Sequence, residues 1–290
     1  MLVPLFFYIL INYVFMKVAL CCIGRMENRY VIEYVEYYKK LGVDKIFIYD
    51  NNHDGEEHFE DVLQSYIDEE FVQIIDYRNK INLSNEGNIQ LQAYTDCYNT
   101  YGSDFDYMCF FDFDEFLTFV EPITIKEYLE RGKEFDMFLI NWRIYTDNNL
   151  VRYEDKPLLE RFTQPMEKYK AVMYNFSENM HIKTICKCKK RIKWYFTPHM
   201  PGSFRLKVCN GSYKPCSAQI FQHIDHDTAY IKHFTTKTIE EWLWKLSRGV
   251  PDRKKDTFLM TYNLDRFFKY NEKTDEKLKF IEENYKKIVK

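Results

Sequence analysis

The first 112 residues alternate between short apolar runs and segments in which apolar residues recur at helical spacing. Gly42 follows the first helical segment as a C-terminal cap, and the turn 50–55 follows the second apolar run. Short apolar runs between turns predict buried strands, whereas a period near 3.6 predicts helices. The predicted strands cover 18–23, 45–49, 71–76 and 107–112, and the predicted helices cover 31–41, 59–67 and 88–100. This order indicates a parallel sheet with covering helices.

The rest of the chain has a less regular pattern. Two Thr-x-x-Glu sequences, at Thr124 and Thr238, have the spacing of capping boxes that start helices. We expect a strand over 136–142, then an irregular segment over 143–235 with short strands near 183–188, 205–208 and 219–224, and helices over 238–249, 256–269 and 274–288. The predicted fold class is α/β, with a mostly parallel central sheet flanked by helices and with C-terminal helices. We expect one catalytic domain over 16–235 and a helical segment, 236–290, packed on it.

Residues 1–15 form an apolar N-terminal segment, broken by Pro4 and Asn12. This segment is short for a membrane span, which needs ~20 residues. It also lacks the basic region and the cleavage site of a signal peptide. We therefore interpret it as an extension or a weak membrane attachment, with a short anchor as the alternative. The expected location is the cytoplasm, with peripheral membrane association through this segment.

Composition narrows the classes of function. The 290 residues are 46% hydrophobic and 18% aromatic, which is ample for a packed core. The net charge of −3 gives no global basic footprint, so we expect no nucleic-acid partner. Eight cysteines in a chain of this length do not form a disulfide-rich pattern, which favours a reducing compartment. Zinc at Cys186-Lys-Cys188 is the weaker interpretation, because Cys-x-Cys is not the usual ligand spacing.

The candidate chemistry centres on the run 110–117, Phe-Phe-Asp-Phe-Asp-Glu-Phe-Leu. A buried strand keeps ionised carboxylates only if their charge is compensated. Asp112 and Asp114 therefore indicate a strand end that opens onto a cleft, where a divalent cation can neutralise them. Hard cations such as Mg²⁺ and Mn²⁺ take oxygen ligands and share them with substrate phosphates. This pattern predicts an enzyme that handles a phosphate-bearing donor.

Three polar groups of residues fall at predicted strand ends, at 24–28, 50–52 and 112–115. In an open α/β sheet, ligands bind outside the carboxyl ends of the strands, so these groups are expected to share one site. The sequence has neither a glycine-rich dinucleotide fingerprint nor a phosphate-binding loop. Rossmann dehydrogenases and P-loop NTPases are therefore disfavoured.

Over about residues 17–250, the chain resembles GT-A-fold glycosyltransferases, most closely the family 2-like and family 92-like groups. The resemblance rests on segments 19–30, 48–52 and 110–117, and on the later pieces 141–142, 160–162, 198–199, 233–238 and 240–242. It implies a GT-A-like fold and metal-dependent transfer of a sugar from a nucleotide sugar, with a UDP-sugar as the first candidate. The expected acceptor is a glycan or polysaccharide hydroxyl, and the expected stereochemistry is inversion.

The resemblance also implies roles for individual residues. Asp112 and Asp114 would hold Mn²⁺ or Mg²⁺ against the diphosphate, with His233 completing the metal site. Lys237 would contact the diphosphate. The base, ribose and phosphate would be received by Asp50, Asn51, Arg25, Glu27 and Asn28. Each of these residues has a purely structural alternative, namely a solvated strand end, a hydrogen-bonded turn or a helix cap.

The acceptor side carries the weakest signals. Asp147 is the candidate general base, and a turn-forming aspartate is its alternative. Trp142, Tyr145 and Trp194 could stack on sugars or simply fill the core. Two other functions stay open. One is a nucleotidyl- or phosphotransferase that uses the same metal, and the other is a non-catalytic carbohydrate-binding scaffold.

Overall fold

The computed structural model describes residues 16–80, 88–167, 177–194, 196–203, 205–249 and 262–288. Four parallel strands of the first half lie in the order β3-β2-β1-β4. They are β1 (Val18–Gly24), β2 (Lys45–Asp50), β3 (Val72–Asp76) and β4 (Tyr107–Phe110). Helices α2 (Asn28–Leu41), α3 (Glu60–Asp68) and α4 (Ile89–Tyr101) lie between them in sequence, and a single 3₁₀ turn, Gly102–Asp104, follows α4. The predicted alternation of strands and helices is confirmed.

The second half extends the same sheet beyond β4, in the order β4-β7-β6-β11-β5 with β10 paired to β6. The added strands are β5 (Glu115–Phe119), β6 (Met137–Ile144), β7 (Ile182–Lys187), β10 (Val208–Asn210) and β11 (Ala229–His233). β7 is antiparallel to both neighbours, and β11 is parallel to β6 but antiparallel to β5. β8 (Ile192–Lys193) and β9 (Gly202–Ser203) form a separate pair. Short helices α5 (Ile125–Arg131) and α6 (Leu158–Arg161) and a 3₁₀ turn, Glu178–Met180, complete this half.

Several predictions for the second half are wrong in detail. The strand predicted over 107–112 ends at Phe110, and β5 begins at Glu115 inside the acidic run. Segment 219–224 is a loop, because the Gln222 side chain donates to the carbonyls of Ser217 and Gln219. The strand predicted near 205–208 lies instead at Val208–Asn210, as β10. Strand β11 was not predicted. Residues 256–261 of the predicted helix 256–269 lie outside the described residues, and α9 (Leu264–Tyr270) covers its end.

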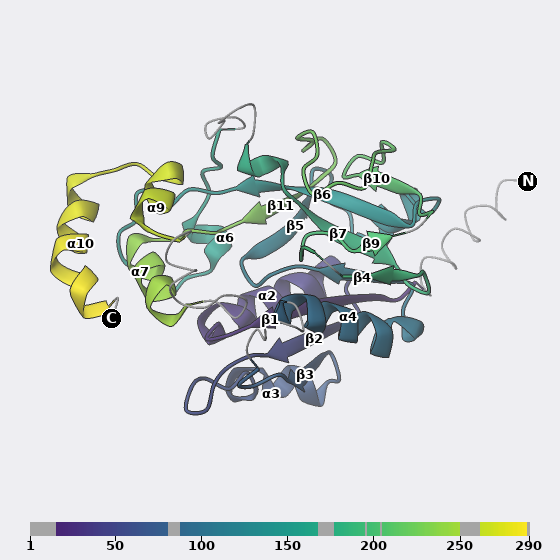
Figure 1. Cartoon of the computed structure of the whole chain (residues 1–290), viewed down its shortest axis with the longest axis horizontal. Coiled ribbons are helices and arrows are strands. Elements are labelled where there is room, and N and C mark those ends of the chain that lie inside the picture. Colours follow the sequence, from purple (N-terminus) through teal and green to yellow (C-terminus); the bar gives the residue numbers. More distant parts are fainter. Residues whose placement is uncertain are drawn as a thin grey trace, which may run out of the picture.

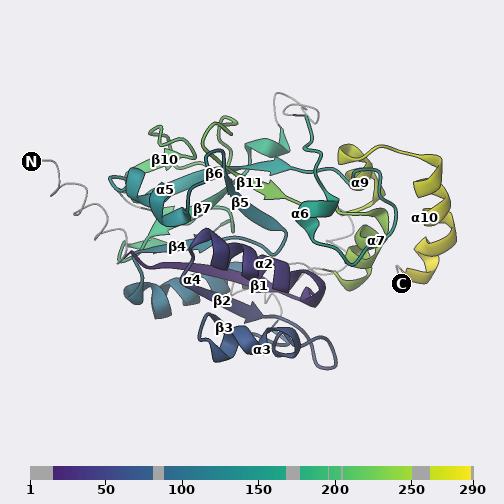
Figure 2. The ribbon, with the colours of Figure 1, turned by 180° about the vertical axis from the view of Figure 1, so that it is seen from behind.

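The sheet has one apolar cluster on each face, and β1 contributes to both. Val18, Leu20 and Cys22 join the cluster that contains residues of α2, α3 and α5, whereas Ala19 and Cys21 join the cluster that contains α4. Successive strand residues point to opposite faces, so this continuous apolar strand is buried on both sides. Figure 1 shows α4 in front of the sheet, and Figure 2 shows α2 and α5 in front from behind.

The C-terminal helices α7 (Ile239–Arg248), α9 and α10 (Asp275–Ile288) gather at one end of the sheet (Figure 1). Trp242 of α7 and Phe267 of α9 share an apolar cluster with Phe280 of α10. A buried ion pair joins this group to the loop after β6, because Lys277 Nζ lies 2.6 Å from Asp147 Oδ2. The helical segment therefore shares both an apolar cluster and a buried charge pair with the sheet region.

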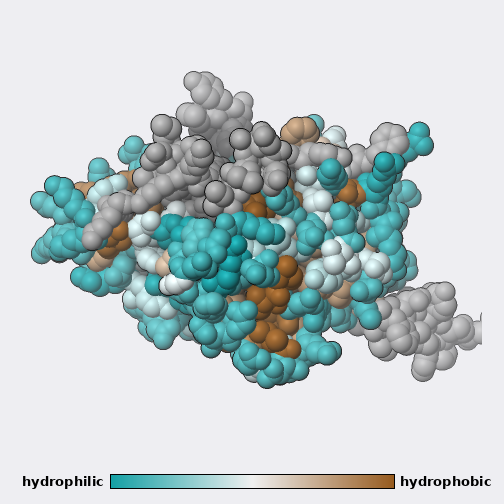
Figure 3. All heavy atoms as spheres, turned by 60° about the horizontal axis from the view of Figure 1, so that its bottom comes forward, coloured by the Kyte–Doolittle hydropathy of each residue, from teal (hydrophilic) through white to brown (hydrophobic). Residues whose placement is uncertain are grey.

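Figure 3 shows one face of the molecule coloured by the hydropathy of its residues. Hydrophilic residues cover most of the face seen in Figure 3, where a narrow hydrophobic strip interrupts them. Within the described ranges, no helix combines the length and the apolar character needed to cross a membrane. The N-terminal segment 1–15 lies outside the described residues, so its predicted membrane association stays a prediction.

Candidate functional site

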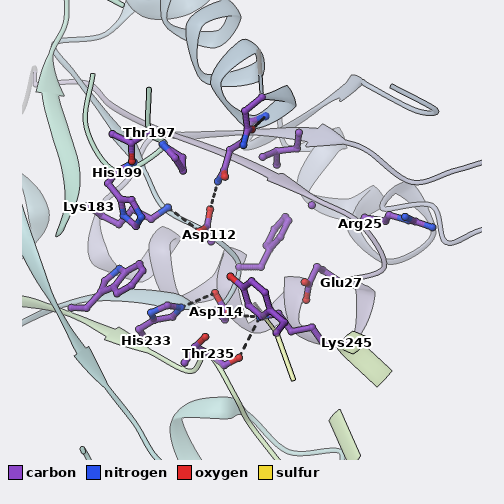
Figure 4. Close-up of a pocket in the computed structure, with 18 of the residues that line it drawn as sticks. Arg25, Glu27, Asp112, Asp114, Lys183, Thr197, His199, His233, Thr235 and Lys245 are labelled. Atoms are coloured by element: carbon purple, nitrogen blue, oxygen red, sulfur yellow. Dashed lines mark hydrogen bonds and ion pairs between the residues drawn. The ribbon is translucent and has the colours of Figure 1, made fainter. Parts of the chain in front are cut away.

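A cavity of about 420 Å³ opens at the carboxyl ends of β1 and β4 (Figure 4). Here the strand order switches, because the chain proceeds from β1 to β2 and β3 on one side and β4 lies on the other. Such a switch point is where open α/β sheets bind ligands. Residues that follow β1, the turn after β4, β7, β11 and α7 all contribute side chains to its lining.

The turn between β4 and β5 forms what we call the acidic floor, residues Asp112 to Glu115. Asp112 and Asp114 line the cavity together with Phe113 between them, whose ring is buried and packs against Tyr34, with ring centroids 5.0 Å apart. Gly24 at the end of β1 makes room for this ring, because a Cβ there would lie 2.3 Å from the Phe113 ring. The buried phenylalanine therefore anchors the turn and leaves both aspartates facing the cavity.

Asp112 is held by a fixed cation and two neutral donors. Lys183 of β7 contacts its Oδ2 at 2.9 Å, while Gln90 and Tyr94 donate to Oδ1 at 2.7 and 3.0 Å. Lys183 is buried and also lies 3.3 Å from Glu115 Oε2. Burial alone would lower the pKa of Lys183, but the two carboxylates raise it, so the ammonium stays charged. Most of the charge on Asp112 is thus compensated within the protein.

Asp114 faces two lysines and a histidine, of which Figure 4 labels Lys245 and His233. Lys237 and Lys245 approach its Oδ2 to 3.4 and 3.5 Å, and His233 Nε2 lies 3.6 Å from Oδ1. Burial would raise the pKa of Asp114, but Lys237, Lys245 and His233 hold it well below its usual range. Lys237 is buried and has a φ of 55°, a left-handed conformation rare for a residue with a side chain. The predicted grouping of Asp114, His233 and Lys237 is present.

The Asp114 and His233 pair has the chemistry of a divalent-cation site. Burial lowers the pKa of His233 to about 3, so its ring is neutral and keeps a lone pair for coordination. The 3.6 Å separation is too long for a hydrogen bond. In the described part of the chain, no three His, Cys, Asp or Glu side chains could hold a metal by themselves. The pair therefore fits a cation that takes most of its ligands from substrate phosphates and water.

Cations outnumber carboxylates around the cavity. The basic lining residues are Arg25, Lys183, Lys245, Arg248 and Arg266, against Glu27, Asp112 and Asp114. Arg25 is paired with Glu56 at 2.5 Å, and Arg248 is paired with Glu27. A surplus of positive charge in a recess attracts anions, and guanidinium groups suit phosphate oxygens. The predicted residues Arg25 and Glu27 are thus at the cavity, next to basic residues that the sequence analysis missed.

The other residues predicted to receive the nucleoside do not line the cavity. Asp50 pairs with Arg78 at 2.7 Å and accepts from the backbone of Asn52. Asn51 donates to the Tyr77 carbonyl at 2.8 Å, and Asn28 donates to the His58 carbonyl at 2.9 Å. These contacts are those of a hydrogen-bonded turn and a helix start. Roles of Asp50, Asn51 and Asn28 in binding stay predictions.

Asp147, the predicted general base, also lies outside the cavity lining. It is buried, pairs with Lys277 and accepts from the backbone of Asn149 at 2.9 Å. Asn148 and Asn149 both adopt left-handed φ angles, as residues of tight turns do. In this structure Asp147 thus has the contacts of a turn residue that fixes α10.

Three aromatic side chains and a proline line another part of the cavity, and we call Trp142, Phe196, Pro198 and His199 the aromatic wall. All four line the cavity. The Trp142 ring lies 4.2 Å from the His233 ring and 5.0 Å from the His199 ring, and its Nε1 donates to Glu115 at 2.8 Å. Phe196 is 95% exposed. Tyr145 and Trp194, the other predicted stacking residues, are buried outside the lining.

Sequence reasoning missed Lys183, Lys245, Arg248 and His199. A signal for the first was present, since Lys183 interrupts the otherwise apolar strand Ile182–Lys187. Lys245 and Arg248 are three residues apart on α7, which places both on one face of that helix. His199 belonged to the pair 198–199 that contributed to the resemblance, but no role was predicted for it, because only the fold brings its loop to the cavity.

Comparison with known proteins gives one family match. Residues 17–286 match the model of glycosyltransferase family 92. No curated protein matches the chain. S. aureus TarS is similar at a TM-score of 0.40 and 11% identity, over 89% of this chain and 44% of that one. TarS 1–349 in complex with UDP has a TM-score of 0.39 and 11% identity, over 87% of this chain and 72% of that one. This chain thus spans less than half of the first of these structures.

Proposed function

The chain belongs to glycosyltransferase family 92, and we propose that it transfers a sugar from a UDP-sugar to a glycan or polysaccharide hydroxyl with the help of a divalent cation. The observation that carries this proposal is the Asp114 and His233 pair, 3.6 Å apart, in a cation-rich cavity at the switch point of the sheet. We infer inversion, in which the acceptor attacks the anomeric carbon from the face opposite the diphosphate.

The donor would occupy the part of the cavity between the acidic floor and α7. A cavity of about 420 Å³ lies in the range of small-ligand sites. Lys245 and Arg248 project from α7, and Arg25 follows β1, so three cations are available to the two phosphates. Glu27 lies beside them, where its carboxylate can accept from ribose hydroxyls.

Asp114 and His233 would hold the cation, and a nitrogen ligand favours Mn²⁺ over Mg²⁺. When bound, such a cation would neutralise negative charge that builds on the departing diphosphate. Lys237 and Lys245, already within 3.5 Å of Asp114, would supply positive charge on the same side. Asp112 is compensated by Lys183, so its predicted role is to position the donor or a water.

The acceptor would enter along the aromatic wall. Trp142 and the exposed ring of Phe196 present flat apolar surfaces, on which the C–H faces of sugars stack. The donor and the acceptor would then meet above the acidic floor. Holding both in one cavity supplies the proximity that a two-substrate reaction needs.

A donor screen with Asp114→Asn tests this function. Wild-type protein with Mn²⁺ is expected to release UDP from at least one of a panel of UDP-hexoses and UDP-N-acetylhexosamines, and EDTA should stop the release. Asp114→Asn should reduce turnover at least ~100-fold, because it removes a charge fixed against the developing diphosphate. Asp104→Asn, an exposed aspartate in the 3₁₀ turn after α4, is the matched control.

Turnover of Asp114→Asn within a few-fold of wild type would contradict the proposal. The products separate the other two functions. Release of pyrophosphate instead of UDP would favour a nucleotidyltransferase. Calorimetry that detects glycan binding but no binding of UDP with Mn²⁺ would favour a carbohydrate-binding scaffold.

A further inference from the structure

Transfer to a hydroxyl needs a group that accepts the hydroxyl proton, and most candidates in the cavity are already engaged. Glu27 Oε1 is paired with Arg248, while its Oε2 is buried without a hydrogen-bond partner among the described residues. Asp112 accepts from three donors. Asp114 faces two lysines, and His233 directs its Nε2 at Asp114. Asp147 does not line the cavity. Because Glu27, Asp112 and Asp114 lie on the side assigned to the donor, the proton acceptor for an incoming hydroxyl is expected in another part of the lining.

His199 has one ring nitrogen fixed and the other open. Its Nδ1 lies 3.0 Å from the backbone carbonyl of Ile182. Because a carbonyl only accepts, Nδ1 carries the hydrogen of the neutral ring and Nε2 carries the lone pair. Among the described residues, Nε2 has no hydrogen-bond partner, and it is not sealed from solvent. Since His199 lines the cavity, this lone pair is available to a ligand (Figure 4).

The surroundings keep His199 neutral and in place. Burial and the nearby Lys183 ammonium lower the pKa of His199 to about 3, so the free ring carries a lone pair at neutral pH. Its ring meets Trp142 edge-on at 5.0 Å and lies 5.2 Å from the ring of His181. Its own carbonyl accepts from Thr184 of β7 at 2.6 Å. The imidazole is therefore preorganised, as a proton acceptor must be.

The position of His199 relative to the acidic floor suits an acceptor between them. Trp142 contacts both the His199 ring and the His233 ring, and His233 in turn faces Asp114. The indole of Trp142 thus connects His199 with the proposed cation site. A hydroxyl bound at His199 Nε2 would therefore enter the cavity that also contains the proposed diphosphate site.

We propose that His199 is the catalytic base, and this assignment rests on the proposed glycosyl transfer. The acceptor oxygen forms a bond to the anomeric carbon while the bond from that carbon to the diphosphate oxygen breaks. The electron pair of the broken bond leaves with UDP, and the acceptor proton passes to His199 Nε2. Ile182 keeps Nδ1 protonated throughout, so the ring becomes imidazolium and later releases its proton to water.

The test measures how fast the wild type, His199→Asn and His199→Ala release UDP from the donor when water is the acceptor. Asparagine can keep a donor in the place of Nδ1 for the Ile182 carbonyl, but it lacks the basic Nε2. We expect His199→Asn to lower kcat at least ~100-fold. Calorimetric affinity for UDP with Mn²⁺ should stay within about 3-fold of wild type, because the donor does not touch His199. Added imidazole should restore part of the turnover of His199→Ala.

His181→Asn is the matched control, because His181 also stacks on Trp142 but does not line the cavity. It should keep kcat within a few-fold of wild type. Turnover of His199→Asn close to wild type, or equal losses of kcat in His199→Asn and His181→Asn without imidazole rescue, would overturn the assignment while the transferase function stands. If the wild-type protein releases UDP from no donor, the proposed function fails and the assignment fails with it.

Discussion

The acidic floor and the aromatic wall meet where Trp142 donates to Glu115, but the two regions differ in how they treat charge. Each aspartate of the floor lies within 3.5 Å of at least one lysine ammonium group. The wall has a neutral histidine whose free nitrogen opens to the cavity. The charges of the floor are therefore fixed by ion pairs, whereas the wall contains a neutral nitrogen that can accept a proton. The two regions should therefore respond differently to the loss of a cation and to a change of pH.

Loss of the floor's buried cation should have the largest effect on stability. Lys183→Met would leave the buried Glu115 and the adjacent Asp112 without their shared ammonium partner. Breaking a buried pair by removing one partner costs about 3 kcal/mol or more of unfolding free energy. Urea denaturation should show this loss, whereas Lys193→Met on the exposed side of β8 should change stability by less than about 0.5 kcal/mol. Equal losses of stability in the two variants would mean that Lys183 does not stabilise the acidic floor.

As the pH is lowered, the contribution of His199 to the pH dependence of stability should appear at a higher pH than the contribution of Asp114. The pKa of His199 is about 3 in the fold and 6.5 ordinarily, so below pH 6.5 the unfolded chain binds a proton that the folded chain does not. Stability must then fall as pH falls, and the wild type should lose about 1 kcal/mol more than His199→Asn between pH 7 and pH 5.5. The pKa of Asp114 is lowered, so its contribution to stability is complete above its ordinary value of 3.8 and is lost only in stronger acid.

Urea midpoints of the two proteins across this pH range provide the measurement. Other titrating groups are common to both proteins, so their contributions cancel in the difference. Parallel curves would show that the fold does not lower the pKa of His199, which would contradict the effect assigned to its burial and to Lys183.

The sequence predicted the floor better than the wall, for a physical reason. The strands 18–24 and 45–50 and the acidic run are local patterns, in which neighbouring residues determine both the element and its exposed end. Asp114, His233 and Lys237 were grouped by resemblance, and the fold does bring them together. A strand near 183–188 was predicted from its apolar run, and β7 (Ile182–Lys187) lies there. By contrast, β11 was not predicted, because it exists through pairing with distant strands and its short run carries no strong local period.

The same argument explains what the sequence missed at the site. His199 and Phe196 lie in a loop whose place depends on β7, for example through the bond from Thr184 to the His199 carbonyl. Asp147 looked like a base because it follows a strand, but its buried partner Lys277 is 130 positions away in the sequence. Pairings over such distances are set by tertiary packing, which a single sequence does not display.

The most direct measurement of the central claim is an anomalous diffraction map of crystals grown with Mn²⁺ and UDP. We expect one strong manganese peak between the carboxylate of Asp114 and Nε2 of His233, with the diphosphate of UDP on its open side and Lys245 and Arg248 near the phosphates. A peak elsewhere, or bound UDP with no metal beside Asp114, would contradict the account.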